Sequence, residues 1–488
     1  ICIVMSVTIA LMCVMPSFTV SAVKNEKPDP IIVVSGVGAC PFYMDEGTEN
    51  ERIAFPPKVD VGKIIIKVLF GVFKAFLKND FDVFAEAVGD AVYDVLGEFA
   101  CDENGNSKYN VTPQRFPKSQ ANYDMYKNTD SAEFGLIHSL VERFGGDNVY
   151  FYNYDWRLDP LSNADELQAF IKNVLKETGD NKVDLIPCSM GGVQTLAYFS
   201  KYGTSYIDSA VFVSSADGGI IFTENLFAGD FNIGQRDTLQ YLATLETGNE
   251  KVDAVLDKLL SVLEKSFVLK AVFAATNLLG DKLNEKAARE AIRKTLGHMP
   301  GMWAFIRGDR YEDAKKLLLY DGTDTLIKKL DAYHYGVGLK RDEILKKAMA
   351  DGVKISYCSG YDNGSLPITS SGYMQGDALI ETVGTSGGAT CAPAGMTLSE
   401  GYTQKVYCSG HNHISADNII DASTCTFPDA TWFFRGGQHV GKETYNSDYS
   451  DFIIWLVTHE KQPDIFENES YPQFMKMDET QKHMSPLK

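Results

Sequence analysis

The stretch that decides the fold is Val183-Asp184-Leu185-Ile186-Pro187-Cys188-Ser189-Met190-Gly191-Gly192, in which a short apolar run leads into a turn of small residues. The run at residues 183–186 is typical of a buried strand, and a helix is expected to continue through Val193, Leu196 and Ala197. A serine on a sharp turn between a strand and a helix is presented to substrate beside backbone N–H groups that can bind an oxyanion. The stretch therefore predicts an α/β fold with Ser189 as a nucleophile.

Strands and helices alternate on both sides of this turn. Apolar runs at residues 31–34, 149–154 and 210–213 predict further strands. Residues 136–144 have the apolar spacing of a helix, and a second helix is expected to begin with a capping box formed by Ser162 and Asp165. Because strands that alternate with amphipathic helices form parallel sheets, we expect a mostly parallel central sheet with helices on both faces.

The alternation stops between residues 220 and 345, where helical patterns occur without a convincing strand, and a strand returns at residues 353–358. The very apolar run at residues 64–77 favours a core helix, with a helix beside an apolar substrate as the alternative. We expect five segments along the chain: a signal peptide (1–22), the first part of the core (23–219), a helical cap (220–345), the second part of the core (346–460) and a polar, peripheral C-terminal tail (461–488).

The charge balance argues against two classes of partner. The 488 residues include 46 Lys and Arg against 65 Asp and Glu, which gives a formal net charge of −19. Nucleic-acid binding and polybasic docking on anionic membranes both need clustered basic side chains. We therefore expect no nucleic-acid partner, and any transient contact with a lipid interface should be apolar rather than electrostatic.

The first 22 residues carry no charged side chain, and their apolar core is followed by small residues up to Ala22. This pattern is typical of a secretory signal cleaved after Ala22, with a membrane anchor as the alternative. We expect a secreted or extracytoplasmic protein.

Removal of the signal would leave seven of the nine cysteines, an odd number that implies a free thiol, and Cys188 is the expected one. For Cys391, Cys408 and Cys425, which crowd one segment, a local bridge and reduced buried thiols both remain open.

The catalytic acid and base are expected after the serine, in the order Ser, Asp, His. Asp362 follows the strand at residues 353–358, and Asp377 lies in a later Gly-Asp turn, so the residues alone leave the acid open between them. His439 follows an apolar strand and sits in a Gly-rich loop, where a mobile catalytic imidazole is expected.

Two backbone N–H groups are expected to hold the oxyanion. One is that of Val37, in the Gly-rich turn after the first strand, and the other is that of Met190, directly after the nucleophile. Within the cap, Met302 and Trp303 are candidates for lining an apolar acyl pocket, with plain core packing as the alternative.

His411 and His413 are rivals to His439 for the role of base. They follow Cys408, but no carboxylate or fourth ligand stands at a convincing metal-site spacing, so we expect a surface loop and no metal. No cofactor is expected either.

Asn153-Tyr154-Asp155-Trp156-Arg157-Leu158 resembles the Y-D-W-R-L signature of the lecithin:cholesterol acyltransferase and lysosomal phospholipase A group of α/β-hydrolases. Residues 30–38 resemble the first strand and oxyanion turn of that group, and residues 188–192 resemble its H-S-M-G-G elbow. The turns at residues 376–377 and 438–440 are similar to its acid and histidine motifs. Pro187 and Cys188 depart from the pattern, since they replace the usual Ala or Gly and His.

The resemblance implies Ser189 as nucleophile, His439 as base and Asp377, rather than Asp362, as acid. It implies a serine acyl-ester hydrolase of the esterase, lipase or phospholipase type, or an acyltransferase, with an acyl ester or lipid as substrate, and the signal-like N-terminus makes this an exported enzyme in our interpretation. Two alternatives remain open: a catalytically silent surface-binding protein that has kept the fold, and a peptidase or amide hydrolase, because a triad does not choose its leaving group.

Overall fold

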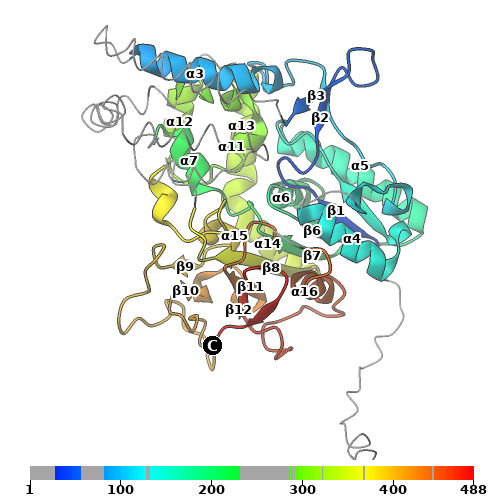
Figure 1. Cartoon of the computed structure of the whole chain (residues 1–488), viewed down its shortest axis with the longest axis vertical. Coiled ribbons are helices and arrows are strands. Elements are labelled where there is room, and N and C mark those ends of the chain that lie inside the picture. Colours follow the sequence, from blue (N-terminus) through cyan, green and yellow to red (C-terminus); the bar gives the residue numbers. More distant parts are fainter. Residues whose placement is uncertain are drawn as a thin grey trace, which may run out of the picture.

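The computed structural model describes residues 28–56, 82–127, 132–230, 286, 289–290, 292–293, 295–320, 322–365, 369–441 and 444–488. Within these ranges, eight strands form a central sheet in the order β13-β12-β11-β8-β7-β6-β1-β5 (Figure 1). Neighbouring strands are parallel except for the last pair, β12 and β13. The strands are β1 (Ile31–Val34), β5 (Val149–Tyr152), β6 (Val183–Pro187), β7 (Ile207–Val213), β8 (Lys354–Tyr361), β11 (Thr431–Arg435), β12 (Phe474–Met477) and β13 (Met484–Pro486).

The predicted mostly parallel sheet with helices around it is confirmed. Every residue of β1, β5 and β6 is buried, as expected for strands covered on both faces. In one group of helices, α4 (Ala132–Phe144) and α16 (Asp448–Val457) pack on one another and on the sheet. In a second group, α6 (Gly191–Tyr202) packs on the sheet and contacts α5 (Pro160–Thr178) and α14 (Arg341–Ala350).

Helix α5 begins earlier than its capping pattern predicts. The Asp159 side chain accepts a hydrogen bond from the Leu161 N–H (3.0 Å), and Pro160 occupies the first helical position. Proline fits there because its fixed φ suits the helix and its missing N–H has no intrahelical partner. The N-cap is therefore Asp159, and the expected capping box at Ser162 is wrong.

The described residues between 220 and 345 contain helices and no strand, as the sequence predicted. They form α7 (Ile221–Phe227), α11 (Pro300–Trp303), α12 (Tyr311–Leu318) and α13 (Asp324–Gly336), which gather in the green part of Figure 1. A buried ion pair fastens α14 to the loop after β7, since Arg341 Nε lies 2.5 Å from Asp217 Oδ2 and both side chains are buried. The Tyr357 hydroxyl donates to the same oxygen (2.7 Å).

Smaller elements complete the described chain. They are the three-stranded sheet of β2 (Phe42–Met44), β3 (Arg52–Phe55) and β4 (Val111–Pro113), the pair β9 (Thr390–Cys391) and β10 (Ile420–Asp421), and the helices α3 (Asp82–Leu96) and α15 (Thr382–Thr385).

The C-terminal segment differs from the peripheral tail that its polar composition predicts. Strands β12 and β13 extend the central sheet, with Met475 and Met477 buried. Gln481, in the turn between these strands, accepts a hydrogen bond from the Gln438 N–H (3.1 Å) and donates one to the Gly436 carbonyl (2.9 Å). The segment therefore holds the loop that carries His439.

Several predictions fall outside the described residues: the signal peptide with Cys2 and Cys13, the apolar run at 64–77, and the part of the expected helical cap at 231–285. The seven cysteines that lie within the described residues form no disulfide. The reduced-thiol alternative therefore holds for Cys391, Cys408 and Cys425. Among the described residues, no helix combines the length and apolarity needed to cross a membrane.

Candidate active site

The sheet topology brings three loops to one edge. Ser189 follows β6, and His439 follows β11. Asp377 lies against the end of β8, because a Cβ atom on Gly360 would lie 2.9 Å from the Asp377 Cβ. Since β6, β8 and β11 run parallel within one sheet, their carboxyl ends share one edge, where ligands of open α/β sheets bind.

Ser189 occupies a strained turn between β6 and α6. Its φ of 52° is a left-handed conformation that residues with a Cβ rarely adopt. The turn is held because the Ser189 N–H donates to the Val213 carbonyl (3.0 Å) and the Gly191 N–H to the Cys188 carbonyl (2.7 Å). Such strain persists only where the surroundings enforce it, and it is concentrated at functional sites.

His439 and Asp377 form a hydrogen-bonded pair, in which His439 Nδ1 lies 2.7 Å from Asp377 Oδ2. The other carboxylate oxygen of the fully buried Asp377 accepts from the N–H groups of Leu379 (3.1 Å) and Ile380 (2.8 Å). Burial alone would lower the pKa of His439, but the charge and hydrogen bond of Asp377, with the charge of Glu133, raise that pKa above its ordinary value.

The competing acid has a different partner. Arg435 Nε donates to Asp362 Oδ2 at 2.8 Å, and Asp362 makes no hydrogen bond with His439. The geometry therefore pairs Asp377, and not Asp362, with the imidazole.

Ser189 and the histidine loop are both anchored at the end of β7. The Ser189 N–H bonds to the Val213 carbonyl, and the Val440 N–H donates to Ser214 Oγ (3.0 Å). Ser189 Oγ makes no hydrogen bond with any described residue, so the structure joins the base to the acid but not to the serine. Catalytic hydrogen bonds often form fully only when substrate is bound.

The turn after β1 lies directly against Ser189. A Cβ atom on Gly36 would lie 2.8 Å from the Ser189 Cβ, closer than side chains tolerate, so only glycine fits there. Among the described residues, neither the Val37 N–H nor the Met190 N–H donates a hydrogen bond. The roles of these two N–H groups as oxyanion donors therefore stay a prediction, with no described acceptor competing for either group.

Glu133, a buried residue of α4, is a further charged group near the site that was not predicted from the sequence. Its Oε1 and Ser189 Oγ each lie 3.3 Å from the position that a Cβ on Gly36 would occupy. Its charge contributes to the raised pKa of His439. No motif signals this carboxylate, because its place near the serine depends on how α4 packs against the β1 turn.

Cys188 is buried beneath the turn, as expected for a residue that flanks an elbow nucleophile. Burial raises the pKa of its thiol well above the ordinary value. Because only a thiolate is an effective nucleophile, this environment makes Cys188 unreactive and leaves Ser189 as the candidate nucleophile.

Arg157 braces the loop after β5. Its buried guanidinium bonds both oxygens of Asp155, at 2.9 and 2.6 Å, and donates to the Phe99 carbonyl (2.9 Å). The same loop contacts the cap, because the Gly301 N–H donates to the Arg157 carbonyl (3.0 Å).

The proposed acyl-pocket residues are packed instead. The Trp303 indole donates to the Gly297 carbonyl (2.8 Å) and meets Phe227 and Tyr311 edge-on. Met302 is also buried. These are the contacts of core residues, so plain packing, and not pocket lining, describes Met302 and Trp303.

Of the rival histidines, His411 is exposed and stacks on Phe466, with ring centroids 4.1 Å apart. His413 is fully buried, which corrects the expected surface loop. Neither bonds to Asp377.

A family model for the α/β-hydrolase fold matches residues 115–440. The chain belongs to this family. The matched span of the α/β-hydrolase contains Ser189, Asp377 and His439. Among solved structures, the α/β-hydrolase is similar to a chain of "The crystal structure of Tle4-Tli4 complex", with 12% sequence identity and a TM-score of 0.23. The match covers 41% of this chain and 48% of that one, so it spans less than half of the length of that protein.

Proposed function

We propose that this α/β-hydrolase is an exported serine acyl-ester hydrolase of the esterase, lipase or phospholipase type, with Ser189 as nucleophile, His439 as base and Asp377 as the acid that orients it. The observation that carries the proposal is the 2.7 Å contact between His439 and Asp377, at the sheet edge where Ser189 occupies a strained turn. Family membership supports a hydrolase, and the ester specificity is our inference.

The mechanism follows from these positions. Ser189 Oγ attacks the ester carbonyl while His439 Nε2 takes its proton, and the Asp377 carboxylate stabilises the resulting imidazolium. The Val37 and Met190 N–H groups hold the negative oxygen of the tetrahedral intermediate. The imidazolium then protonates the departing alcohol, which leaves an acyl group on Ser189. Water, or an acceptor alcohol in a transferase, attacks this ester with His439 again as base.

The substrate class is proposed from the resemblance at residues 153–158 and from the position of the cap. A Cβ on Gly301 would lie 2.9 Å from Met190 Cε, so α11 closes over the residue after the nucleophile. An acyl chain would therefore enter where the cap meets the sheet edge. The net charge of −19 supports an apolar rather than an electrostatic approach to lipid.

Labelling with a fluorophosphonate tests the nucleophile. We expect the wild type and Cys188→Ala to be labelled, Ser189→Ala to remain unlabelled, and the modified peptide to contain Ser189. Absence of wild-type labelling, under conditions that label a known serine esterase, would favour the silent surface-binding alternative. Labelling lost only in Cys188→Ala would identify a thiol nucleophile.

A substrate panel tests the reaction class. Short esters, long-chain triglycerides and phospholipids are compared with peptide and amide substrates, each with and without an acceptor alcohol. We expect turnover of esters, whereas cleavage of amides alone would contradict the proposal. Export is tested separately, since a protein cleaved after Ala22 would have Val23 as its first residue.

A further inference from the structure

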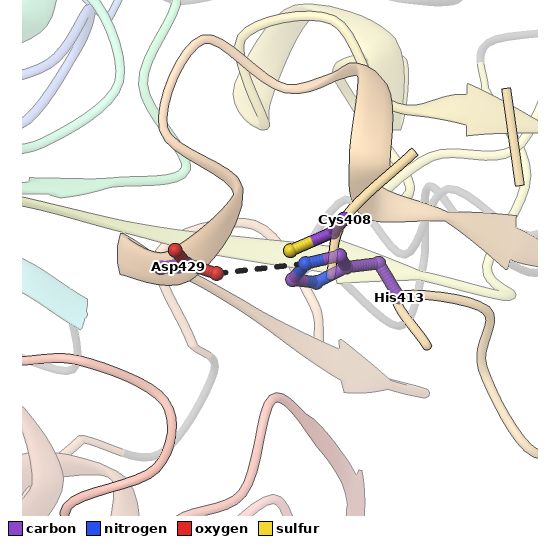
Figure 2. A group of neighbouring side chains, drawn as sticks. All are labelled: Cys408, His413 and Asp429. Atoms are coloured by element: carbon purple, nitrogen blue, oxygen red, sulfur yellow. Dashed lines mark ion pairs between the residues drawn. The ribbon is translucent and has the colours of Figure 1, made fainter. Parts of the chain in front are cut away.

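A second cluster of reactive side chains lies outside the active site, where the segment between Asp377 and His439 returns to the sheet. Figure 2 shows Cys408, His413 and Asp429 side by side. One candidate ligand atom from each residue lies within 4.8 Å of the other two. The sequence predicted no metal because no carboxylate stands at ligand spacing, but the fold brings Asp429, in the short turn before β11, to the pair.

The imidazole of His413 is fully buried, and its hydrogen bonds fix its tautomer. Nδ1 lies 2.9 Å from Gln473 Oε1. The Gln473 amide nitrogen donates to the carbonyls of Pro428 (2.7 Å) and Thr431 (3.2 Å), so its oxygen must be the acceptor. The Nδ1 of His413 is therefore the donor, and in the neutral imidazole Nε2 carries the lone pair.

That Nε2 atom is buried and has no hydrogen-bond partner. Buried polar atoms are almost always satisfied, so an orphan in a well-ordered site calls for an explanation such as an ion. Nε2 points toward Asp429, with Cys408 beside both groups (Figure 2).

The distances suit two ligands of one ion better than a direct hydrogen bond. His413 Nε2 and Asp429 Oδ1 are 3.5 Å apart, whereas a good N–H···O bond measures about 2.9–3.0 Å. Two ligands with bonds of about 2.0–2.1 Å to a tetrahedral zinc ion lie roughly 3.3–3.5 Å apart.

The surrounding contacts preorganise the histidine. The backbone N–H of His413 donates to Gln404 Oε1 (2.9 Å), and the backbone carbonyl of His413 accepts from the Ala422 N–H (2.8 Å). An oxygen acceptor on the second ring nitrogen, as Gln473 supplies here, is the usual outer contact of a metal-binding histidine. The half-exposed Asp429 side chain leaves a route from solvent.

We propose that Cys408 Sγ, His413 Nε2 and the Asp429 carboxylate bind one Zn²⁺ ion, with water as the fourth ligand. A mixed sulfur, nitrogen and oxygen set in a tetrahedral arrangement favours zinc over calcium or magnesium. On binding, the Cys408 thiol loses its proton to solvent and becomes a thiolate. The ion would link the loop that carries Cys408 and His413 to Asp429, just before β11, outside the proposed catalytic site.

Metal analysis of the full chain tests this site. The protein is purified under reducing conditions without chelator, incubated with Zn²⁺, passed through gel filtration and analysed for zinc. We expect one zinc per chain in the wild type and in the matched controls Cys391→Ser and His411→Ala. Cys408→Ser, His413→Ala and Asp429→Asn should lose it. Gln473→Leu should weaken zinc binding about 10–100-fold, because it removes the outer contact.

Substitution of Co²⁺ for zinc gives a spectroscopic readout that can be measured on the wild type itself. The wild type should show the near-ultraviolet thiolate-to-cobalt charge-transfer band, and Cys408→Ser should lack it. Failure of the wild type both to retain zinc and to develop this band would overturn the proposal and leave an ion pair between protonated His413 and Asp429. Zinc loss in His411→Ala equal to that in His413→Ala would overturn the proposed ligand set.

Discussion

His439 Nδ1 and Asp377 Oδ2 lie 2.7 Å apart, although the two residues come from different loops with the whole Cys-bearing excursion between them. The carboxylate is fully buried and its second oxygen is occupied by two backbone N–H groups. Only Asp377 Oδ2 is therefore left to bond the imidazole, which fixes the orientation of the carboxylate toward His439.

We expect Asp377→Asn to lower kcat on an ester substrate by about 10⁴-fold, because the amide cannot stabilise the imidazolium or hold its tautomer. Asp362→Asn should leave kcat nearly unchanged, since Asp362 bonds Arg435. Steady-state kinetics on both variants checks this, with thermal unfolding as the control for folding. A comparable loss in Asp362→Asn would contradict the assignment.

His439→Ala should lower turnover by several orders of magnitude while the protein stays folded, since no other described imidazole contacts Asp377. His411→Ala is the matched control, because His411 is exposed and its ring stacks on Phe466. Single-turnover acylation with a chromogenic ester measures the step directly. If His411→Ala abolished acylation, the base would be misassigned.

Activity should fall at low pH as His439 becomes protonated. The pKa of this imidazole is raised, since the carboxylates of Asp377 and Glu133 outweigh the lowering by burial. The acidic limb of kcat/KM should therefore have its midpoint above about 6.5, the ordinary value for histidine. Glu133→Gln removes one of the two charges, so its limb should move to lower pH. An unchanged limb would show that Glu133 does not act on the imidazole.

Gly36→Ala should lower kcat by about 10²-fold, because its Cβ would lie 2.8 Å from the Ser189 Cβ and displace the nucleophile. Gly336→Ala is a matched control, since nothing lies within 4 Å of the added atom. Burst kinetics of acyl-enzyme formation distinguishes the two. Equal rates in both variants would argue against close packing of the β1 turn on the serine.

Arg341→Met should lower the free energy of unfolding by about 3–5 kcal/mol, because it leaves the Asp217 carboxylate buried without its cation. The double variant with Asp217→Asn should recover part of this loss. Urea unfolding of the wild type, both single variants and the double variant measures the coupling. Additive losses would mean that the two side chains do not stabilise one another.

The strand, turn and helix around Ser189 could be predicted because their signals are local: an apolar run, a serine between small residues, and helical spacing after it. The acid could not be chosen from spacing alone. Asp362 and Asp377 both come after the strand that ends near residue 361, and tertiary contacts separate them, since Asp377 bonds His439 and Asp362 bonds Arg435.

Features that depend on tertiary packing could not be predicted from the sequence. Glu133 reaches the serine only because α4 packs beside the β1 turn. In β12 the buried Met475 and Met477 flank the exposed Lys476 within a polar segment, so the composition of the segment gave no sign of a strand. For Trp303 the sequence left pocket lining and plain core packing open, because only tertiary contacts distinguish these two roles of a large apolar side chain.

The hydrogen bonds of Gln481 to the histidine loop have a consequence for folding during synthesis of the chain. Chains fold progressively from the N-terminus as they leave the ribosome. The turn between β12 and β13 emerges after the serine, the acid and the histidine itself, yet it supplies two hydrogen bonds to Gly436 and Gln438. In a nascent chain the proposed nucleophile therefore emerges long before the loop of the proposed base is anchored, so we expect catalysis only after β12 and β13 have joined the sheet.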